Sequence, residues 1–274
     1  MVDQVELNNG VRMPQLGFGV YKIPGAEATS AVLTAFEAGY RSIDTATLYR
    51  NERAVGEAVT TSGLPREEVF LTTKLWNTDQ GHDAALAAFD ASLRELGLDY
   101  VDLYLIHWPV PSRDTYVETW RALEKIAGDG RARAIGVSNF QIPHLQRLID
   151  ETGVTPAVNQ IELHPWLQQA PLREFHAAHG IATEAWSPIA RGGTRLDGDE
   201  VIGAIAAKHG KTPAQVVLRW HIDLGTIAIP KSVTPRRIAE NFDLDGFALD
   251  EPDLAAIAAL DEGLRLGPDP DTLA

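Results

Sequence analysis

Four residues in the first half of the chain have side chains that can hold or move a proton. Three of them end apolar segments and one lies on a turn: Asp44, Lys74 and His107 at the segment ends, and Tyr49 on the turn after Asp44. A buried carboxylate is costly unless a cation or several hydrogen-bond donors meet it, so Asp44 requires a partner. Each residue alone fits an ordinary packing or ion-pair role, but the set of four indicates a catalytic site.

The chemistry that this set allows is delivery of a proton from the phenol of Tyr49. A free tyrosine has a pKa near ~10, and a neighbouring cation lowers that pKa because it stabilises the phenolate. Lys74 is the predicted cation, and Asp44 is predicted to hold it in place. His107 would then direct a substrate oxygen toward the Tyr49 hydroxyl.

Apolar segments that alternate with helical patterns must position these side chains. The predicted strands are 15–19, 40–44, 69–74, 101–107, 132–137, 158–162, 181–186 and 226–229. The predicted helices are 26–38, 51–62, 82–96, 116–127, 143–151, 171–179, 201–208, 213–223, 235–241 and 252–260. This alternation predicts parallel strands with right-handed crossovers, and the simplest closure is a (β/α)8 TIM barrel with extra C-terminal helices. We expect a single domain over residues 1–274.

Before this pattern begins, residues 5–13 predict an N-terminal β-hairpin that closes the bottom of the barrel. Asn9-Gly10 would supply the positive φ angles of its tight turn. The active site of such a barrel lies at the opposite end, where the strands finish. That placement is the one that brings the four proton-handling residues together.

Polar and aromatic side chains mark the remaining strand ends: Ser138, Asn139, Gln160, Trp186 and Ser187. Amide side chains both donate and accept hydrogen bonds, which suits recognition of a carboxamide. An indole offers a flat face on which an aromatic ring can stack. Turn formation or strand capping explains either amide residue alone about equally well.

A basic segment follows the last predicted strand. Lys231 and Ser232 come directly after it, and Pro235 opens a helix with Arg236 and Arg237 in its first turn. Helix N-termini favour anions, so cations are out of place there unless something negative binds between them. In a protein this acidic, the segment predicts a phosphate site, although a solvated basic turn also explains Arg236.

Composition narrows the class of protein. The formal net charge of −14, without a long basic stripe, argues against a nucleic-acid partner, and the absence of cysteine excludes disulfides and thiolate chemistry. The start of the sequence lacks a signal pattern and no apolar run has membrane-spanning length, so we expect a cytoplasmic protein. No exposed apolar stretch stands out as an interface, so we expect a monomer. His176 and His179 lack the spacing of a metal site and are predicted to be surface residues.

Taken together, these motifs resemble the aldo-keto reductase superfamily nearly from end to end. The chain is most similar to bacterial members of the 2,5-diketo-D-gluconate reductase type. The motifs are Asp44 with Tyr49-Arg50-Asn51-Glu52, Lys74-Leu75-Trp76, Leu105-Ile106-His107-Trp108-Pro109, Gly136-Val137-Ser138-Asn139-Phe140, Asn159-Gln160-Ile161-Glu162 and Ile229-Pro230-Lys231-Ser232.

The resemblance implies a role for each site residue. It implies a catalytic tetrad of Asp44, Tyr49, Lys74 and His107. It also implies a binding site for NADPH, in which Ser138, Asn139 and Gln160 hold the nicotinamide amide and Trp186 stacks on the nicotinamide ring. Ser187 would lie under the pyrophosphate. The resemblance further implies that Lys231, Ser232 and Arg237 face the 2′-phosphate and that Glu240 and Asn241 bind the adenine. Tyr21, Trp76, His107 and Trp108 would line the substrate pocket. The tail after Leu260 is short, which predicts an open pocket.

The leading functional hypothesis is therefore an NADPH-dependent oxidoreductase that reduces the carbonyl groups of small aldehydes, dicarbonyls and keto-sugars, with Tyr49 as the general acid. Two alternatives stay open. One is a barrel aldolase with Lys74 as a Schiff-base nucleophile, which would require an unpaired, desolvated lysine. The other is a redox-sensing protein that binds the nucleotide without catalysis.

Overall fold

The computed structural model describes residues 3–273, so residues 1, 2 and 274 of the predicted domain lie outside the described residues. Eight parallel strands form its central sheet: β3 Phe18–Gly19, β4 Ser42–Asp44, β5 Phe70–Leu75, β6 Val101–Ile106, β7 Ala132–Ser138, β8 Val158–Glu162, β9 Ala182–Trp186 and β10 Ile227–Ala228. Each strand pairs with the next one along the chain, in the order β3 to β10.

The first and last strands close the sheet. Leu16, just before β3, forms a parallel bridge with Ala228 of β10. The Gly17 N–H donates to the Ala228 carbonyl at 2.9 Å, and the Ala228 N–H donates to the Gln15 carbonyl at 2.9 Å. The predicted (β/α)8 barrel is confirmed.

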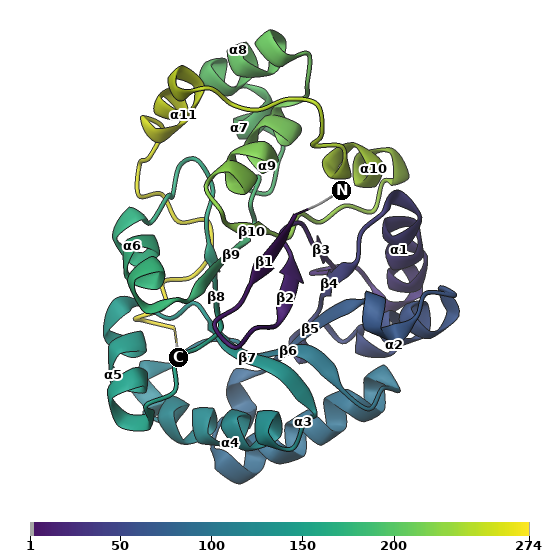
Figure 1. Cartoon of the computed structure of the whole chain (residues 1–274), viewed down its shortest axis with the longest axis vertical. Coiled ribbons are helices and arrows are strands. Elements are labelled where there is room, and N and C mark those ends of the chain that lie inside the picture. The colour runs from purple at the N-terminus through teal and green to yellow at the C-terminus, as the bar shows by residue number, and fades with distance from the viewer. Residues whose placement is uncertain (1–2, 274) are drawn as a thin grey trace.

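Helices surround the barrel in Figure 1. Those that follow the strands are α1 Gly25–Ala38, α2 Glu52–Thr61, α3 His82–Leu96, α4 Tyr116–Gly128, α5 Ile142–Thr152 and α6 Ala170–His179. The later ones are α7 Thr194–Asp197, α8 Glu200–His209, α9 Pro213–Asp223, α10 Pro235–Phe242 and α11 Glu251–Ala258. The sequence did not predict α7, because four residues are too few to show a helical period.

The hairpin consists of β1 Gln4–Glu6 and β2 Arg12–Pro14, with Val5 opposite Met13, and it lies in front of the barrel in Figure 1. Leu7 and Met13 pack against the barrel side chains of Phe70, Leu103 and Ile227, so the hairpin closes the bottom of the barrel as predicted. The predicted turn geometry was wrong, because only Gly10 has a positive φ, of 82°. Leu7 accepts from the Gly10 N–H and donates to the Val11 carbonyl, both at 2.8 Å, so the loop is longer than a two-residue turn.

One residue predicted to lie on the surface is in the core. His176, on α6, is fully buried, and its two ring nitrogens lie 2.9 Å from the Asn159 amide nitrogen and 2.9 Å from the Thr183 hydroxyl. Burial lowers the pKa of His176 to about 3, so the ring is neutral. Its partners belong to β8 and β9, and the helical sequence alone did not show which way the ring points.

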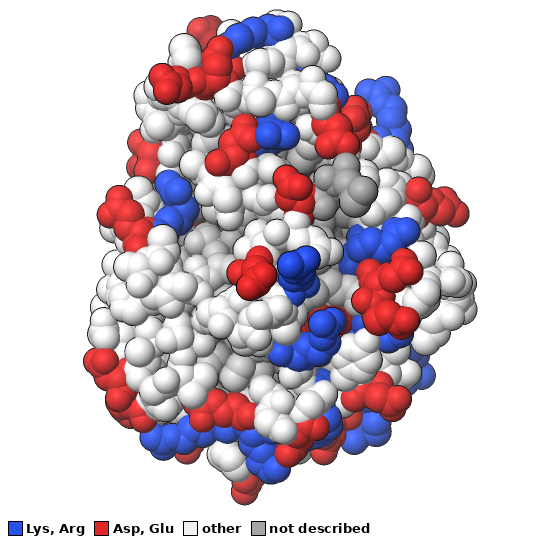
Figure 2. Space-filling model, in the orientation of Figure 1, with Lys and Arg blue, Asp and Glu red and all other residues white. Residues whose placement is uncertain are grey.

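The surface carries mixed charges. On the face shown in Figure 2, lysine and arginine side chains lie between aspartate and glutamate side chains. Within residues 3–273, no helix is both long and apolar enough to cross a membrane.

Candidate active site

The four residues predicted to form a tetrad come together at the C-terminal ends of neighbouring strands. Asp44 ends β4, Lys74 is the last residue but one of β5, and His107 directly follows β6. Tyr49 ends a short 3₁₀ helix, Thr47–Tyr49, that leads from β4 to α2. Because β4, β5 and β6 are parallel neighbours, their ends place these side chains on one face of the barrel.

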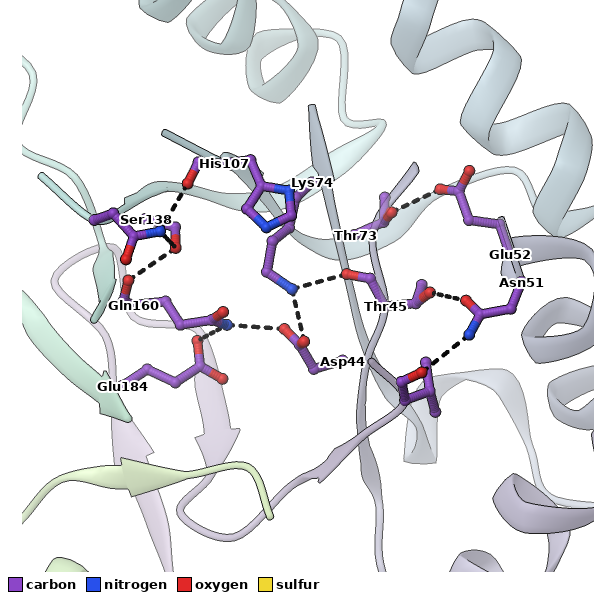
Figure 3. Close-up of polar contacts among 12 residues, drawn as sticks. Asp44, Thr45, Asn51, Glu52, Thr73, Lys74, His107, Ser138, Gln160 and Glu184 are labelled. Carbon is purple, nitrogen blue, oxygen red and sulfur yellow. Dashed lines mark hydrogen bonds and ion pairs between the residues drawn. The ribbon is translucent and has the colours of Figure 1, made fainter. Parts of the chain in front are cut away.

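A buried ion pair lies at the centre of the site (Figure 3). The Lys74 ammonium donates to Asp44 Oδ1 at 2.6 Å and to the Thr45 carbonyl at 2.9 Å, and the side chains of both ion-pair partners are at most 3% exposed. The predicted contact between the two residues is therefore present. A Schiff-base nucleophile needs an unpaired amine, so this geometry argues against the aldolase alternative.

The pKa of Tyr49 shifts in the direction opposite to the one predicted. Burial raises this pKa well above 10.0, and the charge of Asp44, followed by the neighbouring Tyr21 and Glu184, raises it further. Lys74 does not outweigh these effects, because its charge is paired with Asp44 and its nitrogen lies 5.2 Å from the centre of the Tyr49 ring. Tyr49 thus keeps its proton at neutral pH, which is the state that a proton donor needs.

His107 is a neutral imidazole. Burial, aided by the charge of Lys74, lowers its pKa well below 6.5. Its ring packs edge-on against Tyr49 and Trp76, with ring centres 5.9 and 5.2 Å away. Nδ1 is buried without a hydrogen-bond partner among residues 3–273. A neutral, buried imidazole can position a substrate oxygen by hydrogen bonding.

A second buried carboxylate, Glu184 of β9, lies beside the ion pair, and the sequence analysis missed it. Gln160 Nε2 donates to Asp44 Oδ2 at 2.8 Å and to Glu184 Oε2 at 2.9 Å, so the amide joins the two carboxylates. Burial and the charge of Asp44 raise the pKa of Glu184 to about 8. The available signal was a glutamate between Thr183 and Ala185 in a predicted barrel strand.

The side chains predicted to meet a carboxamide form one network. Asn139 has a positive φ of 64°, and its Nδ2 donates to the His107 carbonyl and to Ser138 Oγ, both at 3.0 Å. Trp186 Nε1 donates to Asn139 Oδ1 at 2.8 Å. The amide N–H groups of Asn139 and Gln160 are thereby occupied. The oxygen of Gln160 and the second lone pair of Asn139 Oδ1 remain for a ligand, and such acceptors suit the NH₂ group of a carboxamide.

The residues predicted to bind the phosphate and the adenine lie on α10 and in the segment just before it. Lys231 and Arg237 are exposed, and neither has an acidic partner within residues 3–273. Ser232 is buried and accepts from the Thr234 N–H at 3.1 Å. Glu240 pairs with Arg236 at 3.5 Å, while Asn241 is buried. Ser187 follows β9 with a positive φ of 49°.

Aromatic rings surround the tetrad. Tyr21 is 51% exposed and packs on Tyr49, with ring centres 5.0 Å apart, and Trp76 packs on His107. Trp108, next to His107, is buried. Tyr21 and Trp76 thus contact the four residues directly, as substrate-lining residues would. For Trp108, only its position next to His107 in the sequence links it to the site.

Comparison with known proteins agrees with this geometry. The model of the aldo/keto reductase family matches residues 15–262. An aldo-keto reductase of Mycolicibacterium smegmatis is 58% identical over 99% of this chain and 98% of its own length. Methylglyoxal reductase DkgA of Escherichia coli is 55% identical over 97% of this chain and 96% of its own length.

A solved structure of a Gox0644 variant in complex with NADPH is also similar. It has a TM-score of 0.95 and 50% sequence identity, and the match covers 100% of this chain and 99% of that one. The family model covers most of the chain, and the relatives are 50% or more identical to it. Both findings give the same family. The chain belongs to the aldo-keto reductase family.

Proposed function

We propose that this aldo-keto reductase uses NADPH to reduce the carbonyl group of small aldehydes, dicarbonyls and keto-sugars, with Tyr49 as the general acid. The observation that carries the proposal is the buried Asp44–Lys74 pair beneath a protonated Tyr49 and a neutral His107. When bound, NADPH supplies a hydride to the carbonyl carbon. The proton that balances the reaction comes from the Tyr49 hydroxyl.

The protein residues prepare this proton transfer. His107 directs the carbonyl oxygen toward Tyr49 by hydrogen bonding, and both groups stabilise the negative charge that develops on that oxygen. As the phenol loses its proton, the nearby Lys74 charge favours the phenolate. Asp44 keeps Lys74 in place and charged, so the cation acts when the proton leaves.

The residues at the other strand ends fit the cofactor. The amide oxygens of Asn139 and Gln160, with Ser138, would hold the nicotinamide carboxamide, and Trp186 would stack on its ring. The amide oxygens support this assignment, because each has a lone pair that can accept from an NH₂ donor. Ser187 would lie under the pyrophosphate, at a turn of positive φ.

The basic segment around α10 supports a preference for NADPH over NADH. Lys231 and Arg237 are exposed cations without acidic partners within residues 3–273, and Thr234 makes no side-chain cap at the N-terminus of α10. A helix N-terminus flanked by cations favours a phosphate. We assign Lys231, Ser232 and Arg237 to the 2′-phosphate, and Glu240 and Asn241 to the adenine.

The substrate would enter between Tyr21, Trp76 and Trp108. These rings would give an apolar wall around the four residues, which suits small carbonyl compounds. Methylglyoxal is the first substrate to test, because a relative of high identity is a methylglyoxal reductase. We also infer a monomer that acts in the cytoplasm, where NADPH is available, with light scattering as the check of the oligomeric state.

The test combines binding with turnover. NADPH and NADH are titrated separately into the protein while tryptophan fluorescence is followed, and NADPH oxidation is then measured with methylglyoxal. We expect tight NADPH binding, weaker NADH binding and turnover. Tyr49→Phe should keep NADPH binding and reduce kcat by a factor of about 10² to 10⁴. The proposal fails if NADPH does not bind or if Tyr49→Phe keeps most of its turnover.

A matched control is available in the core. Tyr104 packs on Phe89 with ring centres 4.6 Å apart, and its hydroxyl is buried without a partner among the described residues. Tyr104→Phe removes the same atom as Tyr49→Phe but far from the proton transfer. Its turnover should equal that of the wild type.

A further inference from the structure

The C-terminal tail is attached to the strand ends that form the site. Glu162, at the end of β8, is fully buried, and its two carboxylate oxygens accept from the N–H groups of Leu266 at 2.7 Å and Gly267 at 3.0 Å. The sequence predicted a short tail that leaves the site open. The tail is short, but residues 265–267, here called the tail clamp, reach the cofactor side of the barrel.

Gly267 lies directly against Trp186. A Cβ atom at position 267 would overlap Trp186 Cη2, and it would also lie 3.3 Å from Trp186 Cζ2 and 3.2 Å from Glu162 Oε2. The φ angle of Gly267 is not positive, so the backbone itself would accept an alanine. Position 267 therefore requires glycine because of the indole ring, not because of backbone conformation.

The indole is thus held at two points. Its Nε1 donates to Asn139 Oδ1 at 2.8 Å, and its benzo edge meets Gly267. Both contacts are made at the edge of the ring. They fix the tilt of Trp186 while leaving its faces available for stacking.

Further contacts fix the tail clamp from the outside. Arg191, on the loop after β9, donates to the Leu266 carbonyl at 2.6 Å, and Arg265 donates to Gln169 Oε1 at 3.3 Å. His164 Nε2 lies 3.1 Å from Glu162 Oε1. The clamp therefore connects the end of β8, the loop after β9 and the indole at the end of β9.

We propose that the tail clamp is a positioning element of the cofactor site, in which Glu162 holds the tail and Gly267 sets the tilt of Trp186 for stacking on the nicotinamide ring. The inference rests on the proposed function, because it takes Trp186 to be the stacking residue. Glu162 and Gly267 act through Trp186 and do not touch the reacting atoms. Their loss should change cofactor affinity more than kcat.

The test is a double-mutant cycle on NADPH affinity, measured by calorimetry. Gly267→Ala should raise the NADPH Kd by about three- to tenfold, the range expected when one aromatic stacking contact is lost. Trp186→Phe should also weaken binding. Because phenylalanine lacks the atoms that an alanine at 267 would meet, adding Gly267→Ala to Trp186→Phe should cause little further loss.

Controls separate this inference from the proposed function and from misfolding. Gly203, on α8, has open space around it, so Gly203→Ala should bind NADPH like the wild type. Glu162→Gln should weaken binding in the same direction as Gly267→Ala, because an amide cannot accept from both tail N–H groups with both of its polar atoms. Thermal melting checks that each variant is folded.

Each outcome decides one point. If the wild type does not bind NADPH, the proposed function fails. If the wild type binds but Gly267→Ala binds equally well, or if the losses in the double variant simply add, the tail clamp has no positioning role. If Gly267→Ala does not fold, the Glu162→Gln titration decides, and unchanged affinity there overturns the inference.

Discussion

Buried carboxylates at the two ends of the barrel differ in how completely they are paired with cations and hydrogen-bond donors. At the end closed by the hairpin, Asp102 of β6 is fully buried, and both of its oxygens bind arginine. Oδ2 accepts from Arg66 at 2.8 Å and from the Leu71 N–H at 2.9 Å, and Oδ1 accepts from Arg133 at 2.8 Å. Two arginine cations therefore surround one negative charge.

At the opposite end, two carboxylates share one cation. Asp44 binds Lys74, while Glu184 is bound by the neutral amide of Gln160, and Glu184 Oε1 is buried without a partner among residues 3–273. His107 Nδ1 is in the same situation. The carboxylate at the hairpin end is fully paired, whereas the groups at the opposite end are incompletely paired and have shifted pKa values, a pattern that is typical of functional sites.

Of the variants that test this comparison, Lys74→Met should have the largest effect. It leaves Asp44 buried without a cation, so we expect a loss of about 3–5 kcal/mol in the free energy of unfolding. We also expect kcat/KM to fall at least about a hundredfold, because the cation that favours the phenolate is gone. Urea melts and NADPH oxidation measure the two effects. Lys125→Met, in an exposed pair with Asp129, is the control and should change stability by less than about 1 kcal/mol.

Asp102→Ala should affect stability alone. It removes the partner of two partly exposed arginines and of a buried N–H group, and we expect a loss of about 1–3 kcal/mol in the free energy of unfolding. Because Asp102 lies at the far end of the barrel, kcat and KM of the folded variant should equal those of the wild type. A changed kcat would contradict the division between the two ends.

Glu184→Gln should change how the free energy of unfolding depends on pH. Below about pH 4.5 this carboxyl is protonated in both the folded and the unfolded chain; above that pH the unfolded chain ionises, while the folded chain keeps the proton up to about pH 8. Stability of the wild type relative to the variant should therefore fall as pH rises through this window, by up to about 1.4 kcal/mol per pH unit.

Urea melts of both proteins at pH 5 and pH 8 check this prediction. A constant difference between the two pH values would show that the pKa of Glu184 is not raised. The same comparison for Asp102→Asn gives a reference from the saturated end of the barrel.

The cations at the two ends also differ, and Arg237→Ala tests that difference with the smallest expected effect. Arg66 and Arg133 are bound to Asp102, whereas Arg237 is exposed without an acidic partner within residues 3–273. We expect about a tenfold weaker NADPH affinity and unchanged NADH affinity, measured by titration. Arg236→Ala is the neighbouring control, since Arg236 pairs with Glu240, and equal losses in both variants would remove the assignment of Arg237.

Local sequence pattern determined the order of the elements. The strand and helix positions follow from apolar periodicity and from punctuation by glycine and proline, and the predicted helix 82–96 matches α3 residue for residue. The same pattern placed Asp44, Lys74 and His107 at strand ends. In a parallel barrel this shared position brings them together, so their proximity was predictable before any coordinates.

Tertiary structure decided what the residues experience. The pKa of Tyr49 is raised because burial and the charge of Asp44 outweigh one paired lysine, and Glu184 reaches the site because β9 lies beside β8. The tail clamp joins Glu162 and Trp186 to Gly267, about 80 to 105 residues away along the chain. A sequence states which groups exist, but burial, charge balance and long-range contact depend on how the barrel closes.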